Sequence, residues 1–73
     1  MQLRIITPGM QERTFEATKV FFPGIDGSFE VLSGHAPLIA ALGKGQVRWD
    51  DGSQEIASGF VEVRDNVVKV VAE

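Results

Sequence analysis

The sequence contains no cysteine, one tryptophan and one histidine. Without cysteine, no disulfide can support the fold and no thiolate can bind a metal ion. The seven lysine and arginine residues are scattered, no two are adjacent, and the formal net charge is −3. A nucleic-acid-binding protein is therefore not expected, because it would need a clustered cationic surface.

Long hydrophobic runs are also missing. No apolar run approaches the roughly 20 residues that a membrane-spanning helix needs. The opening segment MQLRIITPGM lacks the cationic head, apolar run and small-residue cleavage site of a signal peptide. We therefore expect the protein to be made and kept in a reducing, soluble compartment, with any membrane association made through a partner.

The single histidine, His35, stands in the stretch GSFEVLSGHAPLIAAL. A hydrolase would need Ser33 as nucleophile and a third group to orient the imidazole, yet no strand-turn-helix elbow surrounds the serine. A zinc site would need carboxylates for its remaining ligands. A phosphate cradle is not expected at GKG (residues 43–45), which neither Ser nor Thr follows. The pattern favours a turn residue held by a backbone hydrogen bond.

The sequence does contain short alternating apolar segments, which glycine and proline interrupt about every 8 to 12 residues. This spacing predicts antiparallel strands with one solvated face. Residues 36–42 fit either a helix with Pro37 in its first turn or a strand buried on both sides. Because no other segment has a helical pattern, the predicted fold class is all-β in either case. Strands are predicted over residues 3–7, 13–22, 28–32, 46–50, 53–64 and 67–72.

Dipeptides that favour turns separate most of these segments. Asp51-Gly52 and Asp65-Asn66 are predicted to form tight hairpins, because these residue types tolerate positive φ. Within residues 53–64, Gly59 indicates a bulge or a close approach of two backbones. The remaining predicted turns are Pro8-Gly9 and Pro23-Gly24.

The alternation and the predicted turns also indicate which of several side chains are buried and which are exposed. Of the consecutive Phe21 and Phe22, one must point away from the core that the other occupies. Trp49 is expected in the core, on the same face as Val47. The carboxylates at Asp50 and Asp51 are expected to be solvated.

Several segments together resemble one protein family. PGIDGSFEVLSGHAPLIAAL (residues 23–42) resembles the PG..G.FGVLPGHAPLL..L stretch of the epsilon subunit of the rotary proton-translocating ATP synthase, called delta in mitochondria. GQVRW, IASGFVEVRDNVVKVVAE and the opening LRIITP followed by FE are similar to further stretches of that family, in the same order. The resemblance covers essentially the whole chain.

The resemblance implies a flattened antiparallel β-sandwich of about ten short strands, in which residues 36–42 form a strand. Residues 1–73 would form this single domain, and the family's C-terminal helical hairpin, with its nucleotide binding and braking, is expected to be absent. The implied role is that of a non-catalytic rotor subunit in the central stalk, which joins the gamma subunit to the membrane c ring and supports coupling of proton flow to ATP synthesis. No cofactor, metal, small-molecule substrate or nucleic acid is expected. The implied location is peripheral, on the cytoplasmic side of a bacterial plasma membrane.

The resemblance also implies two contact sets by matching position. We hypothesise that Phe29 and either Phe21 or Phe22 act as apolar anchors, with Asp26 and Glu30 as rim contacts. The set expected to face the polar loops of the c ring is Asp26, Gly27, Ser28, Phe29 and Glu30. The set expected to lie near gamma is Gly34, His35, Ala36 and Pro37, in which Gly34 allows the bend and Pro37 stiffens the exit.

One departure and two rival functions bear on this interpretation. The family commonly has an acid directly after the turn glycine, whereas here Ser28 and Phe29 separate Gly27 from Glu30. A free-standing β-sandwich module that binds an unrelated protein would share the fold, and co-purification with gamma and c subunits distinguishes it. A small hydrolase using Ser33 and His35 would be revealed by an activity screen.

Overall fold

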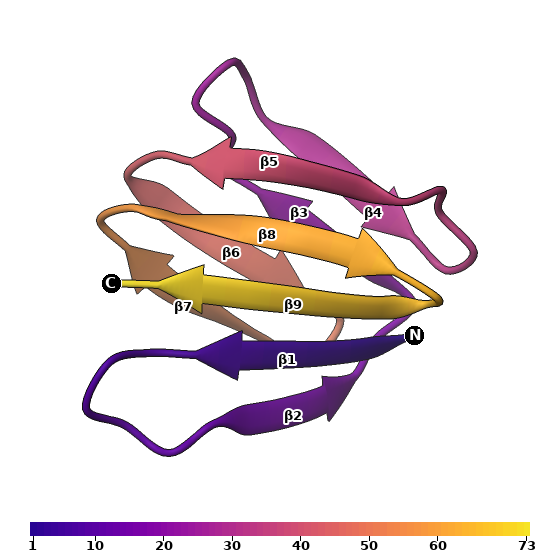
Figure 1. The fold of residues 1–73 in the computed structure, drawn as a ribbon, viewed down its shortest axis with the longest axis horizontal. Coiled ribbons are helices and arrows are strands. Elements are labelled where there is room, and N and C mark those ends of the chain that lie inside the picture. Colours follow the sequence, from indigo (N-terminus) through magenta and orange to yellow (C-terminus); the bar gives the residue numbers. More distant parts are fainter.

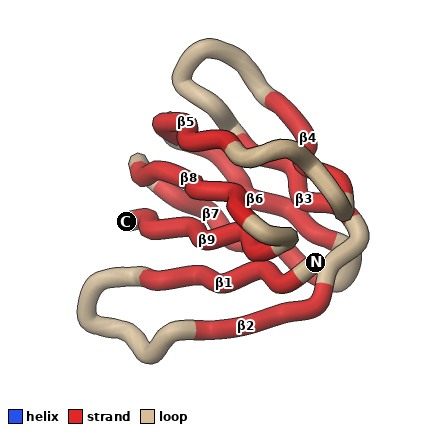
Figure 2. Tube along the Cα trace, turned by 45° about the vertical axis from the view of Figure 1, so that its right-hand side comes forward, coloured by secondary structure: helices blue, strands red, loops and turns tan.

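The computed structural model describes residues 1–73 and contains nine β-strands and no helix. The strands form two stacked sheets, and Figure 1 shows the larger sheet in front. The turned view in Figure 2 likewise contains only strands and loops. The predicted all-β sandwich is confirmed, with nine strands where the resemblance implied about ten. The strands are β1 (Gln2–Ile6), β2 (Arg13–Glu16), β3 (Lys19–Phe22), β4 (Phe29–Leu32), β5 (Leu38–Leu42), β6 (Gly45–Trp49), β7 (Gly52–Ile56), β8 (Gly59–Arg64) and β9 (Val67–Ala72).

The larger sheet has the strand order β2-β1-β9-β8-β5, and the smaller sheet has the order β4-β3-β6-β7. Every pairing is antiparallel except that of β1 with β9, which is parallel and places Leu3 beside Val68. This pair departs from the predicted antiparallel pattern. Since β1 and β9 come from opposite ends of the chain, no hairpin sets their relative direction.

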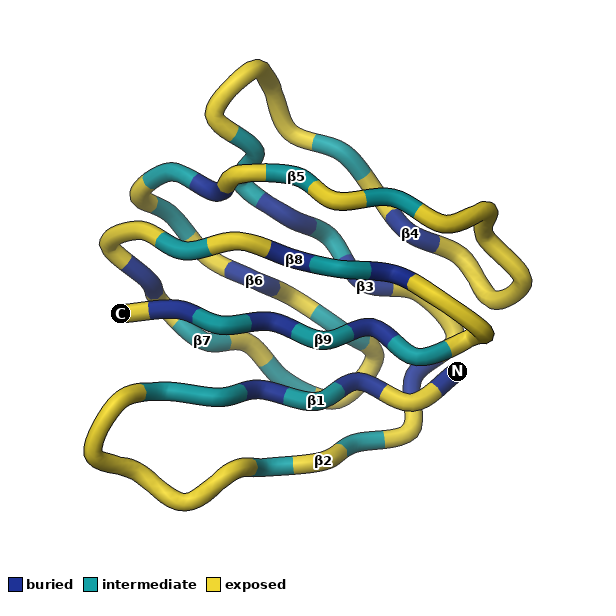
Figure 3. The backbone as a smooth tube through the Cα atoms, in the orientation of Figure 1, coloured by how far each residue is buried: buried dark blue, intermediate teal, exposed yellow.

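The core between the sheets consists only of apolar side chains, because alternate residues of each strand point inward. In β9, for example, Val68 and Val70 are buried while Lys69 between them is partly exposed, and Figure 3 shows this alternation along the strand. Each fully buried Val, Leu or Phe contributes about 1.5–3 kcal/mol. The core residues are Met1, Leu3, Ile5, Ala17, Val20, Phe22, Val31, Leu42, Val47, Ile56, Val61, Val63, Val68, Val70 and Ala72, with Phe15, Phe29, Leu38, Ala40 and Trp49 packed against them.

The single strand predicted over residues 13–22 is wrong, because this segment forms β2 in the larger sheet and β3 in the smaller one. The chain crosses between the sheets at Ala17, whose side chain is buried and whose N–H donates to the Met1 carbonyl at 2.9 Å. Beyond the crossing the inward positions shift by one residue, so that Val20 and Phe22 are buried.

The predicted strand over residues 53–64 is divided in the same way, into β7 and β8. The N–H of Ala57, in the crossing, donates to the carbonyl of Glu73 at 2.6 Å. The close approach predicted at Gly59 is confirmed. A Cβ atom there would clash with the Val71 carbonyl oxygen and lie 2.8 Å from the Cα atom of Ala72, so the backbone contact requires glycine.

Two further predictions are confirmed. Residues 38–42 of the ambiguous segment are strand β5, at one edge of the larger sheet, as the resemblance implied. The alternative of a strand buried on both sides is wrong, because Ile39 and Ala41 on the outer face of β5 are exposed. The Asp65-Asn66 turn joins β8 to β9, with φ values of 53° and 62°. Two successive positive φ values are typical of a type I′ hairpin, whose twist matches that of the flanking strands.

The hairpin between β6 and β7 turns at Asp50-Asp51, one residue before the predicted position, because Trp49 pairs with Gly52. The exposed Asp50 carboxylate accepts hydrogen bonds from the Thr18 hydroxyl at 2.7 Å and from the N–H groups of Thr18 and Lys19 at 3.1 and 3.3 Å. These bonds lower the pKa of Asp50, and the Thr18 hydroxyl is the largest cause. Asp50 is therefore not only solvated, as predicted, but also ties this hairpin to the crossing after β2.

Candidate functional site

The two predicted contact sets lie at opposite ends of β4 (Figure 1). The β3–β4 loop (residues 23–28) holds most of the set assigned to the c ring, and Phe29 and Glu30 of that set begin β4. The β4–β5 loop (residues 33–37) holds the whole set assigned to gamma. The structure therefore keeps each set together, and the two loops lie at opposite ends of β4.

The β3–β4 loop is fastened to β5 and the residue after it by backbone hydrogen bonds. The N–H of Ile25 donates to the Ala41 carbonyl at 3.1 Å, and the N–H of Gly43 donates to the Pro23 carbonyl at 2.8 Å. Between these bonds, Gly24 and Leu42 form an isolated bridge. The loop thus continues the hydrogen-bonding pattern of the larger sheet beyond its edge strand.

A pair of stacked aromatic rings packs against the β3–β4 loop. The ring of Phe29 stacks on that of Phe22, with 5.4 Å between the ring centroids. The backbone of Gly24 lies against Phe29, because a Cβ atom on Gly24 would lie 2.9 Å from the ring and 2.5 Å from the Gly27 carbonyl oxygen. This contact leaves room for no other residue type at position 24.

The structure divides the candidate anchor residues. Phe22 is fully buried, so of the two alternatives for the second anchor only Phe21 remains. Phe29 is half-buried: part of its ring packs beneath the β3–β4 loop, and part remains accessible to a partner. Phe21 is half-buried on the opposite face of β3, where the guanidinium of Arg48 lies 4.5 Å from its ring centroid. Of the consecutive phenylalanines, one therefore points away from the core, as predicted.

The carboxylates of Asp26 and Glu30 are exposed and unpaired. The ion pairs of the chain lie elsewhere, between the Met1 amino group and Glu16 and between Arg4 and Glu12. Asp26 and Glu30 can therefore meet a cation or an N–H donor of a partner without breaking an existing pair.

The β4–β5 loop begins with a tight turn. The N–H of His35 donates to the Leu32 carbonyl at 3.0 Å, and Gly34 between them has a φ of 83°. Positive φ at the third position of such a turn favours glycine, as in a type II turn. This geometry agrees with the predicted roles of Gly34 as the bend and of His35 as a turn residue with a backbone hydrogen bond.

The ring of His35 does not form a dyad with Ser33. Its Nδ1 atom lies 2.6 Å from the carbonyl oxygen of Ala36, so Nδ1 carries the proton and donates it to that oxygen. The backbone N–H of Ser33 donates to the Thr18 carbonyl at 3.2 Å, and no hydrogen bond joins the Ser33 hydroxyl to the imidazole. The imidazole is exposed, together with all of residues 33–37.

Asn66 supplies a contact that the sequence did not predict. Its side-chain oxygen Oδ1 accepts a hydrogen bond from the N–H of Gly34 at 2.9 Å, and its carbonyl accepts one from the N–H of Gln2 at 3.1 Å. The β8–β9 turn therefore holds the β4–β5 loop against the larger sheet. The only signal in the sequence was an asparagine in a predicted turn, which does not specify a partner so distant along the chain.

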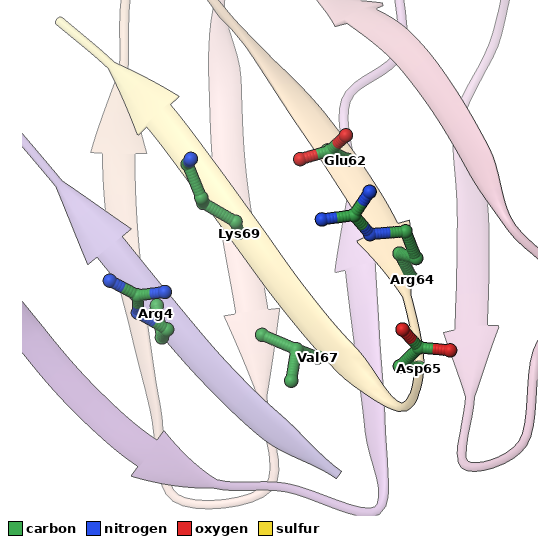
Figure 4. A pocket seen from close by; sticks show the side chains of 6 residues that line it. All are labelled: Arg4, Glu62, Arg64, Asp65, Val67 and Lys69. Carbon is green, nitrogen blue, oxygen red and sulfur yellow. The ribbon is translucent and has the colours of Figure 1, made fainter.

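The outer face of the larger sheet carries a charged region near the β8–β9 turn. Lys69 lies between Arg4 and Glu62 in the register of the strands, and Arg4 donates two hydrogen bonds to Glu12 at 2.8 and 3.0 Å. A shallow hollow in this region, drawn in Figure 4, is lined by Arg4, Glu62, Arg64, Asp65, Val67 and Lys69. Both cationic and anionic side chains line the hollow, so the region has no strong charge of one sign.

The other half of this outer face is apolar. Ile6, Val71, Phe60 and Ala41 lie side by side across four strands, and Phe60 is 47% exposed. Adjoining exposed apolar side chains are typical of protein contact surfaces. The sequence alone did not predict this row, because its members become neighbours only through the register of β1, β9, β8 and β5.

No group of three or more histidine, cysteine, aspartate or glutamate side chains comes together in a way that could hold a metal ion. No helix of the structure is long and apolar enough to cross a membrane. The candidate functional features are therefore the two loops and the outer sheet face.

The fold and these features define a small β-sandwich that displays two braced loops at the ends of one strand. The sequence matches the family described as ATP synthase, Delta/Epsilon chain, beta-sandwich domain, over residues 1–73. The chain belongs to this family.

Curated relatives and a solved structure agree with this assignment. The chain is 40% identical over 77 residues to the ATP synthase epsilon chain of Chlorobium limicola, covering 99% of this chain and 88% of the relative. It is 43% identical over 76 residues to the ATP synthase epsilon chain of Chlorobaculum tepidum, covering 97% and 86%. A chain in the central stalk/c-ring structure of Tetrahymena thermophila mitochondrial ATP synthase has the same fold, with a TM-score of 0.83, 16% identity and coverage of 97% and 61%. Other curated relatives are longer, and this chain spans only 53 to 61% of their length.

Proposed function

We propose that this chain is the β-sandwich of a central-stalk subunit of a rotary ATP synthase, which joins the gamma subunit to the c ring and supports the coupling of proton flow to ATP synthesis. The observation that carries this proposal is the family match, which extends over residues 1–73. It favours this function over that of a free-standing module, because relatives that share almost the whole chain are epsilon chains.

The proposed contribution is mechanical and non-catalytic. A rotor part must transmit torque without shearing, and a close-packed interior deforms little. The core, in which every fully buried residue is apolar, together with the bonds that fasten the chain crossings and loops, suits such a part. The sandwich would be a peripheral component of the complex, on the cytoplasmic side of a bacterial membrane.

The two loops are assigned to the two partners. In this proposal Asp26 to Glu30 face the c ring, and Gly34 to Pro37 face gamma. Their positions at opposite ends of β4 support the assignment, since a single rigid body then presents one loop to each partner. Stable contacts of this kind bury about 1,600 Å² in total, so neighbouring surface must contribute to each.

Reconstitution tests the function. Gamma and c-ring subunits are assembled with and without the chain, and proton-driven ATP synthesis is measured in vesicles. The proposal expects the chain to bind gamma and to raise coupled synthesis. Absence of gamma binding together with unchanged synthesis would contradict it, and capture of an unrelated protein instead would favour the free-standing module.

Cross-linking tests the assignment of the loops. Because the chain has no cysteine, a single introduced thiol can be cross-linked selectively. We expect Ser28→Cys to cross-link to the c subunit and Ala36→Cys to gamma. Met10→Cys, at an exposed position in the β1–β2 loop, is the matched control and should cross-link to neither. Exchange of the two products would show that the loops were assigned the wrong way round.

A further inference from the structure

We infer that Asn66 is a positioning residue for the contact with gamma, because its side chain holds the β4–β5 loop in the conformation that the partner meets. This inference rests on the proposed function. Asn66 lies outside the contact set predicted from the sequence and is 32 residues from Gly34, to which it is bonded.

The geometry gives Asn66 three connections at one point. Its backbone occupies the second positive-φ position of the β8–β9 turn, its carbonyl accepts the N–H of Gln2, and its Oδ1 accepts the N–H of Gly34. The first two connections involve only the backbone. The third depends on the side chain, and it is the bond that reaches the β4–β5 loop.

Asparagine meets both requirements of this position. It tolerates a left-handed backbone better than other residues with a side chain, apart from aspartate, and it carries an acceptor oxygen on a short side chain. Glycine would keep the φ of 62° without strain but would have no acceptor. Aspartate would keep both the backbone conformation and the acceptor oxygen.

The bond to Gly34 matters because the loop has few other connections: at its start, the N–H of Ser33 donates to the Thr18 carbonyl at 3.2 Å. The His35 N–H bonds within the turn, to Leu32, and the imidazole bonds to the adjacent Ala36 carbonyl, so neither bond connects the loop to the β8–β9 turn. Residues 33–37 are all exposed, and hydrophobic burial does not hold them. A loop that is already ordered loses less conformational entropy when it binds, and this raises its affinity.

The test compares Asn66→Gly with Asn66→Asp in the full chain. In the unbound protein, amide hydrogen exchange at Gly34 should be about five-fold faster in Asn66→Gly, the effect of losing one hydrogen bond, and close to the original rate in Asn66→Asp. The Kd for purified gamma should rise about five-fold in Asn66→Gly and less than two-fold in Asn66→Asp. The unfolding midpoints of both variants identify any general loss of structure.

The possible outcomes are distinct. Unchanged exchange at Gly34 in Asn66→Gly would overturn the inference, and so would faster exchange with unchanged gamma affinity, while the proposed function would stand in both cases. Equal losses of affinity in both variants would also overturn the inference, because the acceptor oxygen would then not be the cause. If the unaltered chain does not bind gamma, the proposed function itself fails, and the role of Asn66 fails with it.

Discussion

The β3–β4 and β4–β5 loops flank the same strand but are held in different ways. The first is bonded by backbone groups to Ala41 and Gly43 and rests on the stacked rings of Phe22 and Phe29. The second is bonded at its start by the N–H of Ser33 to the Thr18 carbonyl, connects to the β8–β9 turn through one side-chain hydrogen bond, from Gly34 to Asn66, and has no aromatic support.

This difference determines which substitutions each loop tolerates. Backbone hydrogen bonds survive most side-chain replacements, so the β3–β4 loop should be sensitive only where its packing is disturbed. The β4–β5 loop should be sensitive at the position that supplies its acceptor. Substitutions can therefore disturb one loop and leave the other intact, and the following predictions use this independence.

The largest expected effect is that of Phe29→Ala. This change removes the ring that stacks on Phe22 and lies against Gly24. Truncation of a fully buried Phe costs about 3–5 kcal/mol, so the half-buried Phe29 should cost about 2–3 kcal/mol in the free energy of unfolding. Urea denaturation followed by tryptophan fluorescence measures it.

Phe21→Ala is the matched control for this experiment. The same residue type is removed from the opposite face of β3, where the ring contacts Arg48 and does not support the loop. The loss should be smaller than for Phe29, at about 1 kcal/mol, because Phe29 packs against the core whereas Phe21 makes a cation–π contact outside it. Equal losses in the two variants would show that Phe29 has no special role under the β3–β4 loop.

Gly24→Ala should have the next largest effect. Its new Cβ atom would lie 2.5 Å from the Gly27 carbonyl and 2.9 Å from the Phe29 ring, so the loop must shift. Overpacking of this kind costs about 1–3 kcal/mol in the free energy of unfolding.

Gly34→Ala places its methyl group in open space and is strained only by its φ of 83°, so a loss of about 1 kcal/mol in the free energy of unfolding is expected.

The amide spectra of these two glycine variants sharpen the comparison. Gly24→Ala should shift the amide resonances of residues 23–30 and leave those of residues 33–37 unchanged, and Gly34→Ala should do the reverse. Shifts that spread through both loops in either variant would contradict the independent attachment of the loops.

These features also show how far the sequence could be interpreted. Short alternating apolar segments predicted an all-β fold, and Asp65-Asn66 predicted a hairpin, because both signals are local, whereas the sandwich itself was implied by the resemblance. The divisions of residues 13–22 and 53–64 between two sheets were missed, because alternation of apolar and polar residues does not show at which residue the chain leaves one sheet for the other. Resemblance placed the candidate residues in the two loops, but the bond from Gly34 to Asn66 depends on tertiary arrangement, which no local pattern contains.

The hydrogen bonds of the Asp50 carboxylate should depend on pH, unlike the bond of the neutral Asn66 amide to Gly34. Hydrogen bonds from the Thr18 hydroxyl, and to a smaller degree from the Lys19 and Thr18 backbone, hold the pKa of Asp50 below its ordinary value of 3.8. A lowered folded-state pKa means that the stabilisation is complete above 3.8 and is lost as the pH falls through the folded value.

Thermal unfolding of Asp50→Asn measures this contribution. The variant should be less stable than the unaltered chain at pH 6, and the difference should narrow as the pH falls below about 4. Asp51→Asn is the control for the loss of a negative charge, because Asp51 is exposed in the same turn but makes none of the hydrogen bonds to Thr18 and Lys19. A difference between Asp50→Asn and the unaltered chain that stays constant with pH would exclude the ionised carboxylate as its source.

The smallest effect is expected for Glu30→Ala, and it tests the surface of the β3–β4 loop separately from its support. Glu30 is exposed, lies outside both ion pairs of the chain, and can be removed without disturbing the packing of Phe29. An exposed rim charge contributes about 0.2–1 kcal/mol to binding, which corresponds to less than about a six-fold change in Kd for the c ring. Glu55→Ala, at an exposed position on β7, provides the comparison for a lost negative charge away from both loops. A loss of more than tenfold in Glu30→Ala alone would mean that this carboxylate becomes desolvated and paired at the centre of the contact, because only a buried charge pair produces so large an effect when one partner is removed.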